Sequence, residues 1–196
     1  VIPQFELTNV GKLRSRGIEF ETSIQPTEGL TLFGSAAYVD STIREFPDAE
    51  CYPEQTVAEG CVFDPGIGDF TQDLAGKPLN NSPDFKFNVG FDFETPVSQG
   101  ANFFVNGNYT WQDDVNFALT NNPRTVQPAY GLANLAVGVG SMNDKWRVSL
   151  FVNNLFDQDY VPRIIDDTGR DDPFILLQQV PRNAERFGGI RLRLGF

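Results

Sequence analysis

Apolar and polar residues alternate with a period of two along several segments of this 196-residue chain. Such alternation is typical of a β-strand whose two faces meet different surroundings. In residues 84–95 five apolar side chains alternate with polar or small residues, and in residues 187–196 Ile190, Leu192 and Leu194 alternate with arginine and glycine. The pattern predicts seven strands, over residues 16–25, 30–43, 84–95, 101–112, 129–140, 145–156 and 187–196.

The lengths of these strands and of their connections indicate the fold class. The strands have about 10 to 14 residues, whereas a tilted membrane strand needs ~9–11 residues and strands of soluble proteins usually have ~5–6. Outer-membrane barrels alternate short periplasmic turns with long extracellular loops. The chain follows this rule, with short connections at 26–29, 96–100 and 141–144 and long ones at 44–83, 113–128 and 157–186. We therefore predict an all-β, transmembrane antiparallel β-barrel whose C-terminus is periplasmic.

The two faces of each strand then have different neighbours. Backbone groups in lipid must pair within the protein, so the sheet has to close into a barrel with its apolar face toward the lipid. Seven strands are fewer than the ~8 of the smallest such barrels, which predicts that this chain is part of a larger one. Aromatic girdles are expected near the strand ends, from Tyr38, Tyr109, Trp111, Tyr130 and Trp146. A soluble β-sandwich also alternates, and it remains the alternative fold.

Composition excludes several function classes. The net charge is −11, and an acidic chain does not seek nucleic acid. The chain has no histidine, which rules out Ser-His-Asp and Cys-His catalysis within it, and we predict that it is not an enzyme. No apolar run reaches the ~18 residues of a membrane helix. Residues Val1 to Phe5 lack the features of a signal peptide, so we expect the true N-terminus to lie upstream.

The first long connection combines acidic residues with both cysteines. From Asp40 to Asp73 there are nine acids and one base, Arg44, as expected of a solvated loop. Cys51 and Cys61 lack the further ligands that zinc requires. A local disulfide in an oxidising compartment is favoured over two free thiols. The acidic stretch Asp166–Asp172 faintly resembles a calcium loop, but its spacing matches no defined loop and no metal site is predicted.

Four motifs stand out at the ends of the predicted strands. They are Asn9-Val10-Gly11 with Gly17-Ile18-Glu19, Leu74-Ala75-Gly76-Lys77-Pro78-Leu79 with Pro83, Asn153-Asn154-Leu155-Phe156-Asp157 with Tyr160, and the closing strand Gly189 to Phe196. Together they resemble the C-terminal barrel of the TonB-dependent outer-membrane receptors. The third motif is the most specific, and it resembles the top of the family's penultimate strand. Asn154 and Asp157 also have a structural interpretation, as residues that bond turn amides at a strand end.

The resemblance implies a complete barrel of about 22 strands around a plug. Residues 1–196 would be its C-terminal part, with the upstream strands, the plug and the TonB-contacting segment outside this sequence. The implied function is TonB-dependent active import of a scarce nutrient across the bacterial outer membrane, usually a ferric siderophore, with cobalamin, haem and carbohydrates as variants. Implied partners are outer-membrane lipid and lipopolysaccharide, the TonB complex and the cargo, with no cofactor. Phe196 would be the outer-membrane assembly signal. A passive porin-type channel is the alternative function.

Candidate site residues follow from the same interpretation. Glu19 and Glu21 face the lumen and are expected to pair with Arg191, Arg193 or a plug. Exposed loop aromatics can stack on a catecholate or a sugar, or can pack between loops instead. The acidic loops argue against an anionic ferric siderophore, because like charges repel. The candidate contact residues are Tyr52, Phe63, Phe70, Phe117 and Phe174.

Overall fold

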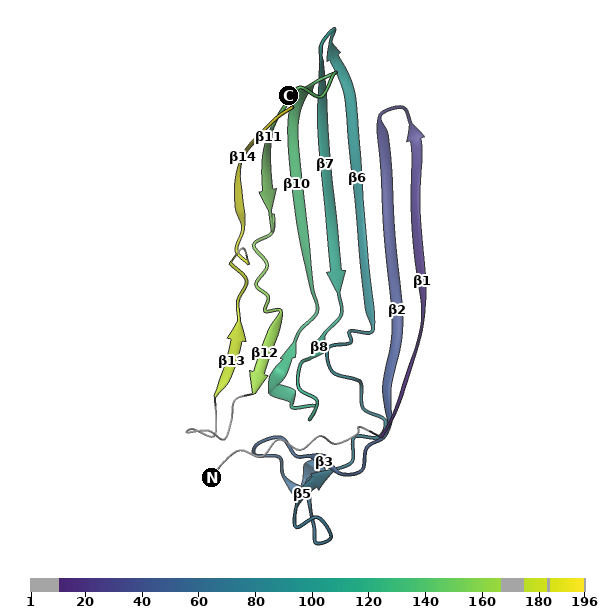
Figure 1. The fold of residues 1–196 in the computed structure, drawn as a ribbon, viewed down its shortest axis with the longest axis vertical. Helices are drawn as coiled ribbons and strands as arrows, with labels where there is room; N and C mark the ends of the chain where they lie inside the picture. Colours follow the sequence, from purple (N-terminus) through teal and green to yellow (C-terminus); the bar gives the residue numbers. More distant parts are fainter. Residues whose placement is uncertain (1–10, 167–174, 183, 196) are drawn as a thin grey trace.

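The computed structural model describes residues 11–166, 175–182 and 184–195. Its main element is a seven-stranded antiparallel sheet in which strands follow one another in chain order, β1-β2-β6-β7-β10-β11-β14 (Figure 1). These strands are β1 Lys12–Thr27, β2 Leu30–Glu45, β6 Phe85–Ser98, β7 Ala101–Gln112, β10 Tyr130–Ser141, β11 Trp146–Asn153 and β14 Phe187–Leu194. The seven predicted strands and their up-and-down order are confirmed, and the β-sandwich alternative is wrong.

The smaller elements all lie in the three long connections. They form the sheets β3-β5-β4, β8-β9 and β12-β13 at one end of the main sheet, and the C-terminal end and the short turns lie at the other (Figure 1). Within the described ranges, no helix is long and apolar enough to cross a membrane. The elements are β3 Ala49–Glu50, η1 Val57–Glu59, β4 Val62–Asp64, β5 Asp69–Gln72, β8 Val115–Asn116, η2 Pro123–Thr125, β9 Val126–Gln127, β12 Arg163–Asp166 and β13 Leu176–Gln179.

The strand register places the predicted apolar side chains on one continuous face. Phe87 lies opposite Trp111, and Leu150 lies opposite both Val137 and Ile190. Leu150 and Ile190 are 57% and 73% exposed, although both are large and apolar. A continuous exposed apolar face across all seven strands is what a barrel wall presents to lipid. We call the opposite, polar face the inner face.

An aromatic cluster lies on the apolar face near the long connections. Its ring centroids are 5.7 to 6.0 Å apart, and its members are Phe85, Phe87, Tyr109 and Trp111. Tyr38 pairs with Phe85 beside it, and Trp146 lies near the short turns. The prediction for Tyr130 is wrong, because this residue pairs with Gln112 on the inner face and stacks on Tyr160 with a centroid distance of 4.8 Å.

The ends of the strands differ from the predicted ranges for two physical reasons. β1 and β2 are longer than predicted, because backbone pairing continues through polar residues where the apolar alternation has stopped. Lys12 and Glu45, for example, form a terminal rung with a 2.7 Å salt bridge. β11 ends at Asn153 because Asn154 has a φ of 48°, in the left-handed region, and cannot continue a strand.

Glycines on the inner face make room for aromatic rings. Phe104 is 3% exposed and lies against Gly138. A Cβ added at Gly138 would be 2.6 Å from Cζ of Phe104 and would also collide with the carbonyl oxygen of Val148.

We expect Gly138→Ala to lower the free energy of unfolding of the barrel by about 1–3 kcal/mol, measured by urea titration of the intact protein. In the control Gly100→Ala, the new Cβ would meet nothing within 4 Å. Equal losses in both variants would contradict the expectation.

Candidate functional site

The first long connection is fixed to the end of β2. Ile43 and Leu74 are fully buried and pack with Ala49 in a small apolar core. The backbone N–H of Ile43 donates to the carbonyl of Lys77 at 2.9 Å, in the manner of a sheet. The connection therefore continues the wall of strands instead of projecting freely from it.

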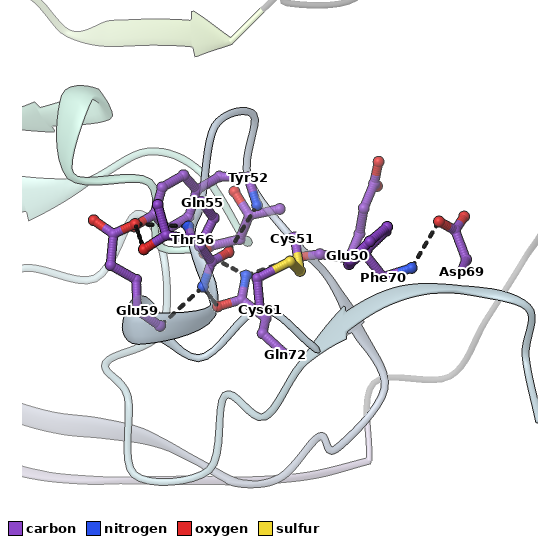
Figure 2. Close-up of a disulfide and its surroundings, with 11 residues drawn as sticks. Glu50, Cys51, Tyr52, Gln55, Thr56, Glu59, Cys61, Asp69, Phe70 and Gln72 are labelled. Carbon is purple, nitrogen blue, oxygen red and sulfur yellow. Dashed lines mark hydrogen bonds between the residues drawn. A yellow bond between two sulfur atoms is a disulfide. The ribbon is translucent and has the colours of Figure 1, made fainter. Parts of the chain in front are cut away.

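A disulfide within this connection joins two cysteines that are ten positions apart in the sequence and so closes a short loop (Figure 2). Cys51 and Cys61 are bonded, with their Cα atoms 5.8 Å apart. Inside the closed loop, the Glu59 carboxylate accepts bonds from the backbone N–H and the hydroxyl of Thr56 at 2.7 and 2.8 Å. These hydrogen bonds hold the pKa of Glu59 below its usual value. The loop thus has its own internal order besides the disulfide.

Gln72 joins this disulfide loop to the second long connection. Gln72 is 5% exposed. Its Nε2 donates to the carbonyls of Glu50 at 2.8 Å and of Thr120 at 3.0 Å. Its Oε1 accepts a 3.0 Å bond from the side chain of Gln55. One amide therefore uses both donors and its acceptor to hold two connections together.

Two further side-chain contacts complete the link between the three connections. Arg124 forms a 2.7 Å salt bridge with Glu54, which joins the second connection to the first. The Nδ2 of Asn122 donates to Asp166 at 2.5 Å, which joins the second to the third. We call the joined segments, residues 49–80, 115–127 and 161–166, the loop platform.

The loop platform carries an open hollow of about 300 Å³ to which all three connections contribute. This volume lies at the lower limit of the range of small-molecule sites, ~300–1,000 Å³. Phe117 and Ile164 supply apolar wall, whereas Glu50, Arg163 and Asp166 bring charges of both signs. The hollow can therefore hold an apolar or aromatic group while Arg163 faces an acceptor on the same molecule.

Four of the five predicted contact residues lie in the described part of the chain, all on the platform, and of these four only Phe117 lines the hollow. Phe63 and Phe70 pair across β4 and β5, with centroids 5.4 Å apart, yet both remain more than half exposed. Tyr52 lies beside Glu59; burial, and then the Glu59 charge, raise the pKa of Tyr52. Phe174 and Phe196 lie outside the described residues.

The sequence does not single out Gln72, Asn122 and Arg163, because a polar loop residue carries no periodic signal.

The acidic residues do not assemble a metal site in the part of the chain that the structure describes, where no three of His, Cys, Asp or Glu cluster suitably. Asp166 accepts a hydrogen bond from Asn122 instead, and residues 167–172 lie outside the described ranges. Near the platform, burial raises the pKa of Asp84, and the charges of Asp113 and Asp40 raise it further. Asp84 therefore lies among other negative charges at the end of the wall that carries the loops.

The inner face of the sheet carries a row of hydrogen-bonded amides. The hydroxyl of Thr110 donates to Asn88 at 3.0 Å, Asn134 donates to Asn108 at 3.3 Å, and the backbone of Asn154 donates to Asn134 at 3.1 Å. These bonds cross four neighbouring strands from β6 to β11. They give the middle of the inner face a neutral polar surface.

The expected ion pairs of Glu19 and Glu21 with Arg191 and Arg193 do not form. The two glutamates lie on β1 and the two arginines on β14, at opposite edges of the sheet. Among the described residues neither glutamate has a salt bridge. Both contribute to an inner-face hollow of about 320 Å³ that Lys86 also lines. On the inner face, Lys86, on the same rung of the sheet as Glu19, is the cation of the described residues that lies nearest to this pair along the strand order.

Comparison with known proteins agrees with this architecture. A family model described as "TonB dependent receptor-like, beta-barrel" matches residues 1–155. The ferric yersiniabactin uptake receptor FyuA from Yersinia pestis has 18% identity and a TM-score of 0.68, with 96% of this chain and 24% of that chain covered. The ferric preacinetobactin receptor BauA from Acinetobacter baumannii has 18% identity and a TM-score of 0.54, with 92% and 21% covered.

A third structure is similar over a shorter part. The siderophore receptor PiuA from Acinetobacter baumannii has 16% identity and a TM-score of 0.56, with 76% of this chain and 18% of that chain covered. At these identities the likeness shows the fold alone. The chain spans no more than 24% of the length of any of the three receptors.

Proposed function

Because the chain belongs to the TonB-dependent receptor β-barrel family, we propose that residues 1–196 form the C-terminal part of the barrel of a larger bacterial outer-membrane receptor. The proposed function is active import of a small iron-bearing cargo, a ferric siderophore, driven through TonB. The family consists of receptors rather than enzymes, in agreement with the expectation from the sequence. The plug and the segment that contacts TonB belong to the part of the receptor outside this sequence.

One observation carries the proposal: the three long connections are locked to one another around a hollow, at the end of the wall opposite the short turns. A passive pore needs no ordered binding surface at its outer mouth. A receptor that captures scarce cargo does, because preorganised loops lose less conformational entropy on binding. The three structurally similar proteins are a ferric yersiniabactin uptake receptor, a siderophore receptor and a ferric preacinetobactin receptor, which supports this class of cargo.

The charge of the platform narrows the proposed cargo. Glu50, Glu54 and Glu59 lie in the disulfide loop or beside it, and Asp84 lies nearby at the start of β6. A strongly anionic complex would be repelled on approach to such a surface. The proposed cargo is therefore a ferric complex of low net charge, with an aromatic or apolar part for Phe117 and an oxygen acceptor for Arg163.

Removal of the exposed aromatic pair tests whether the cargo also contacts the platform outside the hollow. In the intact receptor, Phe63→Ala combined with Phe70→Ala is expected to raise the Kd for a radiolabelled ferric siderophore by about 2- to 12-fold, the loss of one aromatic contact of ~0.5–1.5 kcal/mol. Val57→Ala is the matched control, since Val57 is 71% exposed in the same connection. An unchanged Kd in the double variant would remove these two residues from the site.

Two measurements on the intact receptor test the transport class. We expect uptake of the labelled complex to stop when the proton gradient is collapsed, and liposomes containing the receptor to show no large steady conductance. A large steady conductance together with gradient-independent uptake would instead favour the porin-type channel.

A further inference from the structure

The apolar face changes character near the long connections, on the first two strands of the sheet. Ile18 of β1 is 72% exposed and lies opposite Tyr38 of β2. One rung further toward the long connections, Arg16 lies opposite Asp40. Side chains two residues apart on a strand share a face, so Arg16 and, two residues beyond it, Arg14 project from the same face as Ile18. Two arginines therefore stand on the side of the wall that faces lipid.

One carboxylate holds both guanidinium groups. Nη2 of Arg14 lies 2.8 Å and Nε of Arg16 lies 3.3 Å from the same oxygen of Asp40. Two positive charges thus share one negative charge. Lys12, beyond Arg14 on the same strand, is balanced by Glu45 in a 2.7 Å salt bridge. The two arginines and Asp40 therefore leave one positive charge uncompensated among the described residues on this part of the face.

The two arginines keep donors for a further acceptor. Nε of Arg14 is buried and donates no hydrogen bond within the described part of the chain. The side chain of Arg16 is 69% exposed, and in the described ranges its guanidinium is bonded through Nε alone. A guanidinium presents five N–H donors in a planar fork that fits the oxygens of a phosphate group. The pair can therefore bind a phosphate that approaches from the lipid side.

The position of the pair along the strands matches the headgroup layer of a bilayer. Tyr38 pairs with Phe85 of the aromatic cluster, and aromatic girdles mark the border of the hydrocarbon core. With about 3.3 Å per residue and a strand tilt of ~45°, Arg16 and Arg14 lie about 5 and 9 Å beyond Tyr38 along the membrane normal. The headgroup layer is ~5–8 Å thick on each side. Arg16 therefore lies within this layer and Arg14 at its outer border.

The neighbouring surface suits the apolar part of a lipid. Ile18 and Phe20 continue the same face of β1 below the arginines and are 72% and 64% exposed. β1 is an edge strand of the described sheet (Figure 1), so a further strand of the barrel would lie beside it. Side chains stand roughly perpendicular to a sheet, so that strand would flank the two arginines without covering them.

We propose that Arg14 and Arg16 bind a phosphate group of lipopolysaccharide in the outer leaflet, with Asp40 as the positioning residue that holds the two guanidinium groups side by side. This inference rests on the proposed function, because it needs the wall to stand in an outer membrane with the long connections outside. The acyl chains of the same lipid lie along Ile18 and Phe20. Positive charge and apolar surface on adjoining rungs favour a phosphorylated lipid over a free phosphate ion or an uncharged lipid.

Native mass spectrometry of the intact, purified receptor in detergent tests this site. The receptor is titrated with bis-phosphorylated lipid A and, separately, with lipid A from which the phosphates have been removed. We expect the unsubstituted receptor to bind the phosphorylated form more tightly. In Arg14→Gln combined with Arg16→Gln, the Kd for the phosphorylated form should rise about tenfold, as for the loss of one hydrogen bond to a charged group. The two forms of lipid A should then bind alike.

Two further double variants control the measurement. Arg191→Gln combined with Arg193→Gln removes two arginines that also lie two residues apart on one strand, but on the inner face. It should keep the preference for the phosphorylated lipid. Arg14→Lys combined with Arg16→Lys keeps both charges while losing the planar fork, and we expect its Kd to lie between those of the unsubstituted receptor and the glutamine variant. The gel mobility of the folded barrel verifies that each variant is folded.

Several results would overturn the site. They are equal binding of both lipids by the unsubstituted receptor, an unchanged preference in the Arg14→Gln, Arg16→Gln variant, and an equal loss in the inner-face control. Displacement of lipid A by an equal concentration of inorganic phosphate would also overturn it, in favour of a site for free anions. The Kd for a labelled ferric siderophore, measured on the same variants, reports separately on the proposed function. The lipid site can be present even if the cargo assignment is wrong.

Discussion

Replacing Asn154 by alanine is expected to lower the free energy of unfolding of the barrel by about 2–4 kcal/mol. Asn154 is 4% exposed, and its Nδ2 donates to the carbonyls of Gln158 at 2.9 Å and Ala184 at 2.6 Å. Its Oδ1 accepts the backbone N–H of Gln158 at 2.9 Å. Alanine would leave the buried carbonyl of Ala184 and the backbone groups of Gln158 without these partners, and it would also have to adopt a φ near 48°.

A second substitution separates the two causes. Asn154→Gly removes the same amide contacts but adopts a positive φ without strain. We expect it to be more stable than Asn154→Ala by about 1 kcal/mol, the approximate strain of a left-handed alanine. Urea titration of the purified receptor, followed by the gel mobility of folded and unfolded barrel, measures all three proteins. An alanine variant within ~0.5 kcal/mol of the parent, as for an ordinary surface change, would show that the turn does not depend on Asn154.

The wall of the barrel could be predicted from the sequence because one physical signal repeats on every strand. Each strand separates two different environments, and the resulting period of two is visible in Phe85, Phe87 and Val89 as clearly as in Ile190 and Leu192. The short turns follow because few residues can reverse the chain tightly. Tyr130 shows the limit of this reasoning, since moving one residue along a strand reverses the face, and an aromatic residue at a strand end does not show which face it occupies.

The loop platform could not be predicted in the same way. Its contacts join residues far apart in sequence, such as Gln72 to Thr120 and Glu54 to Arg124, and neither pair belongs to a repeating pattern. The prediction for the aromatic residues rests on their position in a polar connection. That criterion found Phe117 in the hollow, but it could not distinguish Phe117 from Phe63 and Phe70, which pack on each other. Composition identifies a loop as a binding candidate without showing which side chains share a surface.

The expected pairing of Glu19 with Arg191 failed for a different reason. The sequence shows that these charges share one face, but it does not show how far apart they lie on that face. The order of strands places five strands between β1 and β14, which is too far for two side chains to meet. Arg147 and Glu94 show the correct reach, since they meet across β7 and β10. Predicting ion pairs in a barrel wall therefore requires the order of the strands as well as the face of the sheet on which each side chain lies.

Removing the disulfide is expected to have the largest effect on cargo binding with little effect on the barrel. Replacing Cys51 and Cys61 by serine opens the loop between two cysteines that are ten positions apart. In the chain-entropy model, losing this cross-link costs about 2–3 kcal/mol of local stability. The loop would then lose the geometry by which Gln72 holds Glu50 and Thr120. We expect the Kd for a ferric siderophore to rise about tenfold, since ~1.4 kcal/mol of preorganisation corresponds to that factor.

Hydrogen exchange and reduction distinguish this local effect from general damage. Backbone amides of residues 49–72 are expected to exchange faster in the double variant, while those of β7 and β10 keep their protection. Treating the unsubstituted receptor with a phosphine reductant should give the same pattern without a change in sequence, which controls for placing a serine at the 5%-exposed position of Cys61. Unchanged exchange in residues 49–72 after complete reduction would mean that the hydrogen bonds of Thr56, Glu59 and Gln72 hold the loop without the disulfide. The tenfold loss of cargo affinity should then be absent as well.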